Sequence, residues 1–546
     1  MPPVTENADR ITSSPVINLC RFRGGHATPM RHYAQTQTEH WQVHRRHPDN
    51  ARLSRVTREG WLAKGGKMFL AEPERTSSGS SFVCSKSENV LSVIEKCLDN
   101  GVGSCLIVED DQRLVGRISL DDIRRGLRDG TALTDPTVGW HLAATASVPA
   151  MRQLRNDTTD EASLQPILDP AGLLTGVRVD RSTEFVQIAR PHLTCAEFRS
   201  LLDAFLSGWI SSKGPYVQKF EDDFSDFVGS RHGIAVANGT VALHLALTAL
   251  GVGPGDEVIV PDLTFAATIN AVLHCGATPV IADIDRHTWS MTLENVVQAC
   301  TARTKAIIPV HLYGRPAEIG PIADFAAERG VAVVEDCAEA HGARYAGRPV
   351  GRFGEVGCFS FYANKIVTTG EGGMCLTDSS ELAAMLRRLR DHGMAPGQAY
   401  WHDMVGFNYR ITNLQAAMGE AQLQRIEGTL KRNAGVAGAY REALHGIQGV
   451  RFPPSMPDVY EPVVWLASVL VPADEREAIL RAAREANVEM RPFFHPLSVM
   501  PPYARYARHC SNSLELAATG INLPTSAAID DQIVDRVARV FRDVLG

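Results

Sequence analysis

The sequence predicts an α/β protein with a mostly parallel central sheet and a smaller C-terminal α+β lobe, preceded by a separate small α/β module. In the middle of the chain, near-continuous apolar runs alternate with helical stretches. Runs that are apolar on both faces are typical of strands in a parallel sheet that helices cover on both sides. The runs are EVIVPD (257–262), TPVIADID (278–285), TKAIIPVH (304–311) and VAVVED (331–336).

The chain of 546 residues is too long for a single hydrophobic core, so several domains are expected. Changes in composition and periodicity predict four segments. These are a disordered basic leader (1–67), a small module (68–186), a large domain (187–430) and a small C-terminal domain (431–546).

The leader, residues 1–67, lacks sustained hydrophobic periodicity and carries a charge balance of +6, against −7 for the whole chain. Polar, basic sequence without periodicity favours disorder. Two alternatives stay open: a basic arm that binds an acidic partner, or a working protein that starts at Met68.

The small module shows an internal repeat. Residues 88–127 have the pattern of a helix, a strand, an acidic turn, a strand and an Asp-capped helix. The strand–turn–strand unit recurs in weaker form over 164–180, although no helix is evident after Asp180. The segment resembles a tandem CBS domain, and the resemblance rests on LIVEDDQRLVGRISLDDI and on this second copy. The resemblance implies regulation or assembly and an adenine nucleotide between the repeats; a structural appendage without a ligand is the alternative.

The two C-terminal segments contain further helices and strands. Residues 265–276 and 319–330 have helical spacing between the apolar runs, and residues 420–440 predict one long helix. Residues 463–471 and 488–494 predict strands of the smaller lobe. In a parallel α/β sheet, ligands bind at the carboxyl ends of the strands.

Composition excludes several classes of function. The net charge of −7 argues against a nucleic-acid partner. The sequence has no apolar run long enough to span a membrane and no secretory leader. Its eleven cysteines are scattered without a C-x-x-C pair, which predicts a reduced, cytoplasmic protein, and no metal site is expected.

Lys365 is the first candidate catalytic residue. It lies between an apolar strand, Cys358–Phe361, and the glycine-rich turn at 370–373. Such a lysine suits a Schiff base with an aldehyde cofactor, because the amine must be desolvated and deprotonated to attack. A solvated surface charge is the alternative, since most lysines are exposed.

Three other features provide parts of a site for a cofactor with a phosphate and a pyridine ring. Gly239 and Thr240 open a buried helix whose N-terminus can hold a phosphate. Asp336 ends an apolar strand, where a carboxylate can pair with a protonated ring nitrogen, and Phe265 follows another strand and can stack on the ring. Each has an ordinary alternative: a capped core helix, a structural ion pair and a core aromatic.

In order and spacing, these features resemble the DegT/DnrJ/EryC1/StrS family of sugar aminotransferases, which are fold type I pyridoxal-phosphate enzymes. The resemblance covers residues 187–546. It rests on the blocks GWISSKGPYVQKFE, GVGPGDEVIVPDLTFAAT, VVEDCAEAHGARY, SFYANKIVTTGEGGM and GFNYRITNLQAAMG.

The resemblance implies that the cofactor is pyridoxal 5'-phosphate. Lys365 would bind it as a Schiff base and move the proton between cofactor and substrate carbons. Asp336 would pair with the pyridine nitrogen and Phe265 would stack on the ring. Glu339, where many members carry Gln, would lie near the ring hydroxyl.

The resemblance also implies how the phosphate is held. Gly239, Thr240 and Ser360 would bind it within one subunit. Asn408 would reach the phosphate of the neighbouring subunit's cofactor, which implies a homodimer with shared active sites.

Three blocks most resemble the GDP-perosamine synthase branch of the family: EDCAEAHGA, VHLYGRPAEI and RPFFHPLSVMPPY. The branch implies transfer of an amino group from glutamate to C4 of the nucleotide sugar GDP-4-keto-6-deoxymannose, for surface polysaccharide or glycoconjugate biosynthesis. The candidate substrate-binding residues are Arg491, His495 and Ser498. Members commonly carry His at the position of Ser498, and related enzymes often carry Tyr at that of His495, so the sugar and nucleotide stay open.

Two alternative functions remain at this point. One is a 3- or 4-aminotransferase that acts on a UDP- or dTDP-linked keto sugar. The other is a nucleotide-sensing regulatory protein with an inactive aminotransferase scaffold, against which the intact Lys365 and Asp336 argue.

Overall fold

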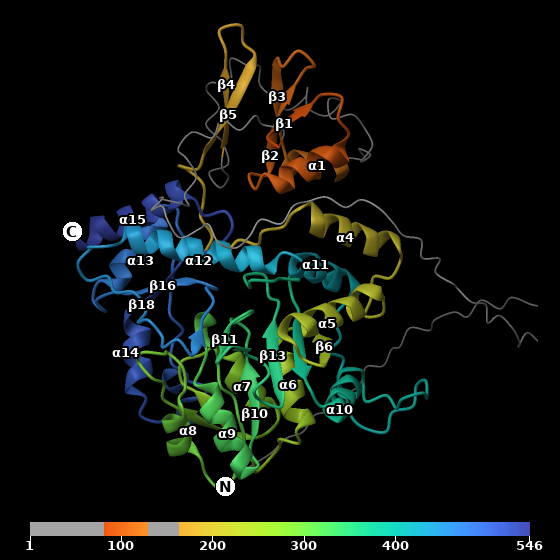
Figure 1. Ribbon diagram of the computed structural model, residues 1–546, viewed down its shortest axis with the longest axis vertical. Coiled ribbons are helices and arrows are strands. Elements are labelled where there is room, and N and C mark those ends of the chain that lie inside the picture. Colours follow the sequence, from red (N-terminus) through yellow and green to blue (C-terminus); the bar gives the residue numbers. More distant parts are fainter. Residues whose placement is uncertain (1–80, 129–162) are drawn as a thin grey trace, which may run out of the picture. The chain divides into compact units, whose positions relative to one another are not determined.

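The computed structural model describes residues 81–128 and 163–546 (Figure 1). The expected leader, 1–67, lies outside the described residues. Within the described ranges, no helix combines the length and apolar character needed to cross a bilayer.

The small module contains a three-stranded sheet in the order β1-β2-β3 and a separate two-stranded hairpin, β4-β5. Strand β1 is parallel to β2. The β2–β3 pair forms a first antiparallel hairpin, and the β4–β5 pair forms a second. The elements are β1 (Val83–Ser85), α1 (Val90–Asp99), β2 (Ser104–Val108), β3 (Leu114–Ser119), α2 (Leu120–Arg128), β4 (Ser163–Leu168) and β5 (Leu174–Asp180).

The two hairpins of the module share their turn geometry, as the internal repeat predicts. Each has a register shift just before its turn, between Ile107 and Val108 in the first and between Ile167 and Leu168 in the second. Gln112 and Gly172 occupy the matching turn positions with φ of 65° and 82°. A bridge between Arg113 and Leu173 joins the hairpins, and their apolar side chains form one cluster.

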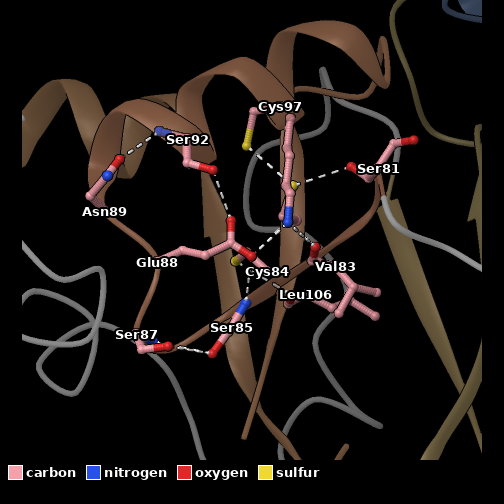
Figure 2. A network of polar contacts seen from close by, with 12 residues as sticks. Ser81, Val83, Cys84, Ser85, Ser87, Glu88, Asn89, Ser92, Cys97 and Leu106 are labelled. Carbon is pink, nitrogen blue, oxygen red and sulfur yellow. Dashed lines mark hydrogen bonds and ion pairs between the residues drawn. The ribbon is translucent and has the colours of Figure 1, made fainter. Parts of the chain in front are cut away.

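A polar network joins β1 to α1 through Glu88, whose Oε1 accepts from Ser85 N at 3.1 Å (Figure 2). Asn89 Oδ1 accepts from Ser92 N at 2.9 Å, while the Glu88 carboxylate accepts from Ser92 Oγ at 3.0 Å and Lys96 Nζ at 2.6 Å. Burial raises the pKa of the nearby Cys84 thiol to about 12, so this cysteine is an inert core residue.

The cap of α2 differs from the prediction. Ser119 occupies the cap position, and Asp122 is its partner within the first turn. Asp122 Oδ2 accepts from Ser119 N at 2.9 Å, and Ser119 Oγ accepts from Asp122 N at 3.1 Å. The pair forms a reciprocal capping box, in which the acidic residue lies three positions inside the helix.

The large domain is built on a seven-stranded sheet in the order β6-β14-β13-β10-β9-β7-β8. Only β14 runs against its neighbours, which confirms a mostly parallel sheet. The strands are β6 (His232–Val236), β7 (Glu257–Pro261), β8 (Thr278–Ala282), β9 (Thr304–Ile307), β10 (Ala332–Asp336), β13 (Val356–Ser360) and β14 (Gly373–Thr377).

Helices cover both faces of this sheet, because alternate residues of each strand point to opposite sides. On one face, Val258 and Val334 pack in a cluster with α6, α7 and α10; on the other, Ile259 and Val333 pack with α8 and α9. The helices are α4 (Cys195–Leu206), α5 (Pro215–Val228), α6 (Gly239–Ala249), α7 (Ala267–His274), α8 (Leu293–Ala299), α9 (Ile319–Arg329), α10 (Ser380–Arg390) and α11 (Asn413–Leu423).

The single helix predicted over 420–440 is wrong. The chain forms α11, which ends at Leu423, and α12 (Ile426–Ala443). Arg425 between them has a non-helical φ of −124°, and its guanidinium donates to Glu197 and to the His192 carbonyl, both at 2.6 Å. These contacts to the segment around α4 account for the break, which the helical periodicity does not reveal.

The small lobe has the predicted α+β character, with a sheet in the order β16-β18-β17 that packs on α12, α13 and α15. Its elements are α12, β16 (Ala467–Leu470), α13 (Arg476–Glu485), β17 (Arg491–Pro492), α14 (Ser511–Thr519), β18 (Gly520–Leu523) and α15 (Asp531–Leu545). Short pieces complete the fold: β11 (Arg344–Tyr345), β12 (Arg348–Pro349), β15 (Tyr460–Glu461), and the 3-10 turns η2 (Leu312–Gly314), η3 (Leu497–Val499) and η4 (Ala504–Tyr506).

Candidate active site

Lys365 lies just beyond β13, in a buried turn rather than on the surface. Its side chain is only 11% exposed, which argues against a solvated charge. The Nζ atom lies 3.3 Å from Glu339 Oε1 and 3.8 Å from the centroid of the Trp465 ring. A carboxylate and an aromatic face therefore hold the amine in position.

Glu339 is the buried partner of this lysine. Its Oε2 accepts from Tyr313 N at 2.9 Å, and Tyr313 adopts a φ of 53°, which is uncommon outside glycine. Burial raises the pKa of Glu339, and the Lys365 charge acts in the opposite direction. The carboxylate thus fixes both the lysine amine and the backbone of the η2 turn.

Trp465 is a contact that sequence reasoning missed. It enters the site from the small lobe, is 5% exposed, and its Nε1 donates to the Asn364 carbonyl at 2.7 Å. The sequence identified its surroundings only as an apolar strand, and it follows Asn364 by 101 positions. Only the fold brings the indole and the lysine together.

Asp336 lies at the carboxyl end of β10, directly opposite Cys358 of β13, the strand that leads to Lys365. Its side chain accepts from Thr268 Oγ1 at 2.9 Å and from Ala338 N at 3.1 Å, and burial raises its pKa. Across the described ranges, no Lys or Arg side chain forms an ion pair with it. The structural ion pair considered as its alternative role is therefore absent from the described part of the chain.

Gly239 and Ser360 form the proposed phosphate cradle. The N-terminus of α6 is capped by Asn238, whose Oδ1 accepts from Val241 N at 3.0 Å. The first-turn N–H groups of Gly239 and Thr240 have no acceptor within the helix. A Cβ atom built on Gly239 would lie 2.8 Å from Ser360 Cβ and 3.2 Å from its Oγ, so the helix end closely approaches the serine.

We expect Gly239→Ala to weaken cofactor binding by roughly 10- to 100-fold, because the methyl group displaces Ser360 and perturbs charge-assisted hydrogen bonds worth about 1.5–3 kcal/mol. Titration of the cofactor-free protein, followed by absorbance, measures this. Gly253→Ala is the matched control, since a Cβ there meets nothing within 4 Å. Equal cofactor affinities in the two variants would contradict the assignment of the cradle.

The remaining cofactor candidates are exposed. Phe265 is 60% exposed and its ring lies 5.7 Å from that of Phe494, so it forms part of an open surface instead of the core. Asn408 is also exposed; its Oδ1 accepts from Arg410 Nη2 at 3.0 Å.

The three substrate candidates have different surroundings. Arg491 is half exposed and pairs with Glu489 at 2.6 Å, while His495 is exposed. Ser498 donates two hydrogen bonds to the buried Asp262, one from its N–H at 2.7 Å and one from its hydroxyl at 3.0 Å. Ser498 therefore anchors the loop of the small lobe to the end of β7.

One buried cluster has the composition of a metal site. Within the described residues, His311, Glu335 and Cys337 place their ligand atoms within 4.8 Å of one another. Hydrogen bonds already use the His311 and Glu335 atoms: His311 Nε2 contacts Glu335 Oε2 at 3.2 Å, His311 Nδ1 accepts from Ala317 N, and Glu335 accepts from Gly351 N. The cluster is a structural network that supports β10 behind Asp336.

The residues of the site fit pyridoxal phosphate. Asp336 is a buried carboxylate with two hydrogen-bond donors and, among the described residues, no direct Lys or Arg partner, so a protonated pyridine nitrogen would suit it as a cationic partner. The cradle of Gly239, Thr240 and Ser360 provides donors for a phosphate at a helix N-terminus. Lys365 offers a shielded amine to an aldehyde.

Comparisons with known proteins agree with this geometry. Residues 192–542 match the model of the DegT/DnrJ/EryC1/StrS aminotransferase family. The chain is 42% identical to a GDP-perosamine synthase of Caulobacter vibrioides over 367 residues, covering 66% of this chain and 98% of that protein. It is 39% identical to a UDP-N-acetyl-3-dehydro-alpha-D-glucosamine 3-aminotransferase of Acidithiobacillus ferrooxidans over 60% of this chain and 87% of that one.

A solved structure shares the fold. The aminotransferase TlmJ from Streptoalloteichus hindustanus superposes with a TM-score of 0.63 at 32% identity, covering 66% of this chain and 98% of that one.

Proposed function

Because the chain belongs to the DegT/DnrJ/EryC1/StrS aminotransferase family and is a pyridoxal-phosphate-dependent sugar aminotransferase, we propose that it makes GDP-perosamine. It transfers the amino group of glutamate to C4 of GDP-4-keto-6-deoxymannose, for surface polysaccharide or glycoconjugate biosynthesis. The observation that carries the proposal is the 42% identity to a GDP-perosamine synthase across 98% of that protein. The ten free cysteines of the described residues agree with a cytoplasmic location.

When bound, pyridoxal phosphate accepts the amino group and stabilises negative charge on the neighbouring carbon. Lys365 Nζ would hold the aldehyde of the cofactor and move the proton during amino transfer. Asp336 would pair with the protonated ring nitrogen. The Trp465 ring and the Glu339 carboxylate aim the lysine amine and shield it from water.

The test is a panel of keto-sugar nucleotides supplied with glutamate, with products identified by mass and by the position of the new amine. We expect GDP-4-keto-6-deoxymannose to give the 4-amino product with the highest kcat/KM. The 39% identity to a UDP-sugar 3-aminotransferase favours a second candidate. A higher kcat/KM on a UDP- or dTDP-linked sugar would replace the first proposal with this one, and no turnover on any of them would favour the regulatory scaffold.

The proposed assembly is a homodimer with shared active sites. Three large aromatic side chains are exposed in separate segments of the large domain: Trp209 at 55%, Phe265 at 60% and Trp401 at 61%. Aromatic residues are enriched at protein interfaces, which supports the proposal. Asn408, in the chain segment that follows Trp401, completes the partner's phosphate cradle in this proposal.

Mixing inactive variants tests the shared site. Lys365→Ala and Asn408→Ala homodimers should each have little activity. If Asn408 serves the partner's cofactor, a mixed dimer contains one site with both residues intact, and activity should return to a fraction of wild type. A protein that elutes as a monomer, or mixtures no more active than their components, would overturn the proposal.

The small module is proposed to be a tandem CBS-like unit that binds an adenine nucleotide. The two hairpins with matching turns support an internal pair. Thermal melts with AMP, ATP and GDP test it, because a ligand specific for the folded state raises the melting temperature. No shift with any of the three would leave the module a structural appendage.

A further inference from the structure

A cavity of about 230 Å³ lies apart from Lys365, between α12, β16 and the segment around Trp289. We call it the Arg315 cavity; it is lined by Trp289, Arg315, Arg441, Phe452, Met456 and Ser468, among others. Tyr313 also lines it, and the Tyr313 ring stacks on that of Trp465, the residue that contacts Lys365. The cavity is therefore separated from the lysine amine by aromatic rings, and Lys365 does not line it.

Arg315 is a buried guanidinium without a carboxylate. It is 8% exposed, and three of its N–H groups donate to carbonyls: Nε to Thr288 at 3.2 Å, and Nη2 to His287 at 2.8 Å and Pro454 at 3.1 Å. No Asp or Glu of the described residues forms an ion pair with it. Burial lowers its pKa to about 10, and its guanidinium lies over the Trp289 ring, 4.8 Å from the ring centroid.

The lining of the Arg315 cavity holds a second cation. Trp289 also lines the cavity; its fully buried Nε1 has no hydrogen-bond partner among the described residues. Arg441 is exposed, and its guanidinium stacks over the Phe452 ring at 4.8 Å. The lining includes two arginines and neither Asp nor Glu.

We propose that the Arg315 cavity binds a small organic anion, with a carboxylate or phosphate head on Arg315 and an apolar body against Phe452 and Met456. An anion gives the buried guanidinium the acidic partner that the described residues do not provide. Arg441 attracts the ligand from solvent. Aromatic and proline side chains provide the apolar wall that a bare ion does not need.

Thermal melts of the cofactor-saturated full-length protein test this at constant ionic strength. The probes are inorganic phosphate, phenyl phosphate and benzoate, with sodium chloride as reference, and bound cofactor keeps the probes out of the phosphate cradle. We expect phenyl phosphate or benzoate to raise the melting temperature by a few degrees more than chloride does. The stronger of the two shows whether the natural head group is a phosphate or a carboxylate.

Arg441→Glu should abolish the probe-induced shift, because it reverses the charge at the mouth without removing a contact of Arg315. Arg432→Glu is the matched control: it makes the same change on the same helix outside the cavity lining and should keep the wild-type shift. Arg315→Gln should also lose the shift. Because this substitution removes hydrogen-bond donors from three carbonyls and can disturb the fold, the test is judged on Arg441→Glu. No shift in wild type, or an equal shift in Arg441→Glu, would overturn the proposal.

Discussion

Replacement of Lys365 by alanine is expected to reduce transamination by about 10⁴-fold or more, because in the proposed mechanism one side chain both binds the cofactor and moves the proton. Borohydride reduction followed by mass spectrometry of the wild type should place the cofactor on the peptide that contains Lys365, and the variant should carry none. Turnover in the variant close to wild type would mean that the lysine has no catalytic role.

The same substitution also has a predictable effect on stability. Lys365 is the cation nearest to the buried Glu339, so Lys365→Ala leaves a carboxylate without its partner. We expect the cofactor-free variant to lose about 1–3 kcal/mol of stability near neutral pH. Lys365→Ala/Glu339→Gln should recover much of this loss while remaining inactive. Equal melting temperatures for the single and double variants would show that the ion pair contributes nothing.

The order of strands and helices in the large domain could be predicted from local patterns. Continuous apolar runs identify buried strands wherever they occur, and Lys365 and Asp336 stand at strand ends where chemistry in α/β sheets is expected. Because β10 and β13 are neighbouring parallel strands, both residues lie at the same edge of the central sheet. Their local sequence contexts therefore already point to a common site.

Contacts between distant segments could not be predicted in this way. Trp465 and Thr268 show no special pattern in the sequence, yet one lies on the lysine and the other donates to Asp336. Ser498 resembles a substrate residue, but the buried Asp262 accepts both of its hydrogen bonds. The break at Arg425 depends on Glu197, 228 positions away. In each case the partner is set by the tertiary fold, which periodicity does not encode.

Asp336→Asn is expected to lower kcat/KM by roughly 10²- to 10³-fold, since it removes one partner of a buried ion pair worth about 3–5 kcal/mol when the cofactor is bound. The amide keeps the shape of the carboxylate, and its oxygen and nitrogen can still meet Ala338 N and Thr268 Oγ1. The loss should therefore appear in kcat as well as in cofactor affinity. Thr268→Val, which removes a hydrogen bond but keeps the carboxylate, should have a smaller effect.

Without cofactor, the same substitution should have the opposite effect on stability. Burial raises the pKa of Asp336, so the folded protein binds this proton more tightly than the unfolded chain does. Stability from this group is therefore present below the ordinary pKa of aspartate and falls as pH rises through the raised value. The amide of Asp336→Asn has no charge to bury, so near neutral pH the cofactor-free variant should melt at a higher temperature than the cofactor-free wild type. This difference should vanish in acid.

Cofactor should then raise the melting temperature of the wild type more than that of the variant, because only the Asp336 carboxylate gains a cationic partner. A cofactor-free variant that is less stable than wild type at neutral pH would show that the buried carboxylate is already neutralised by the protein itself.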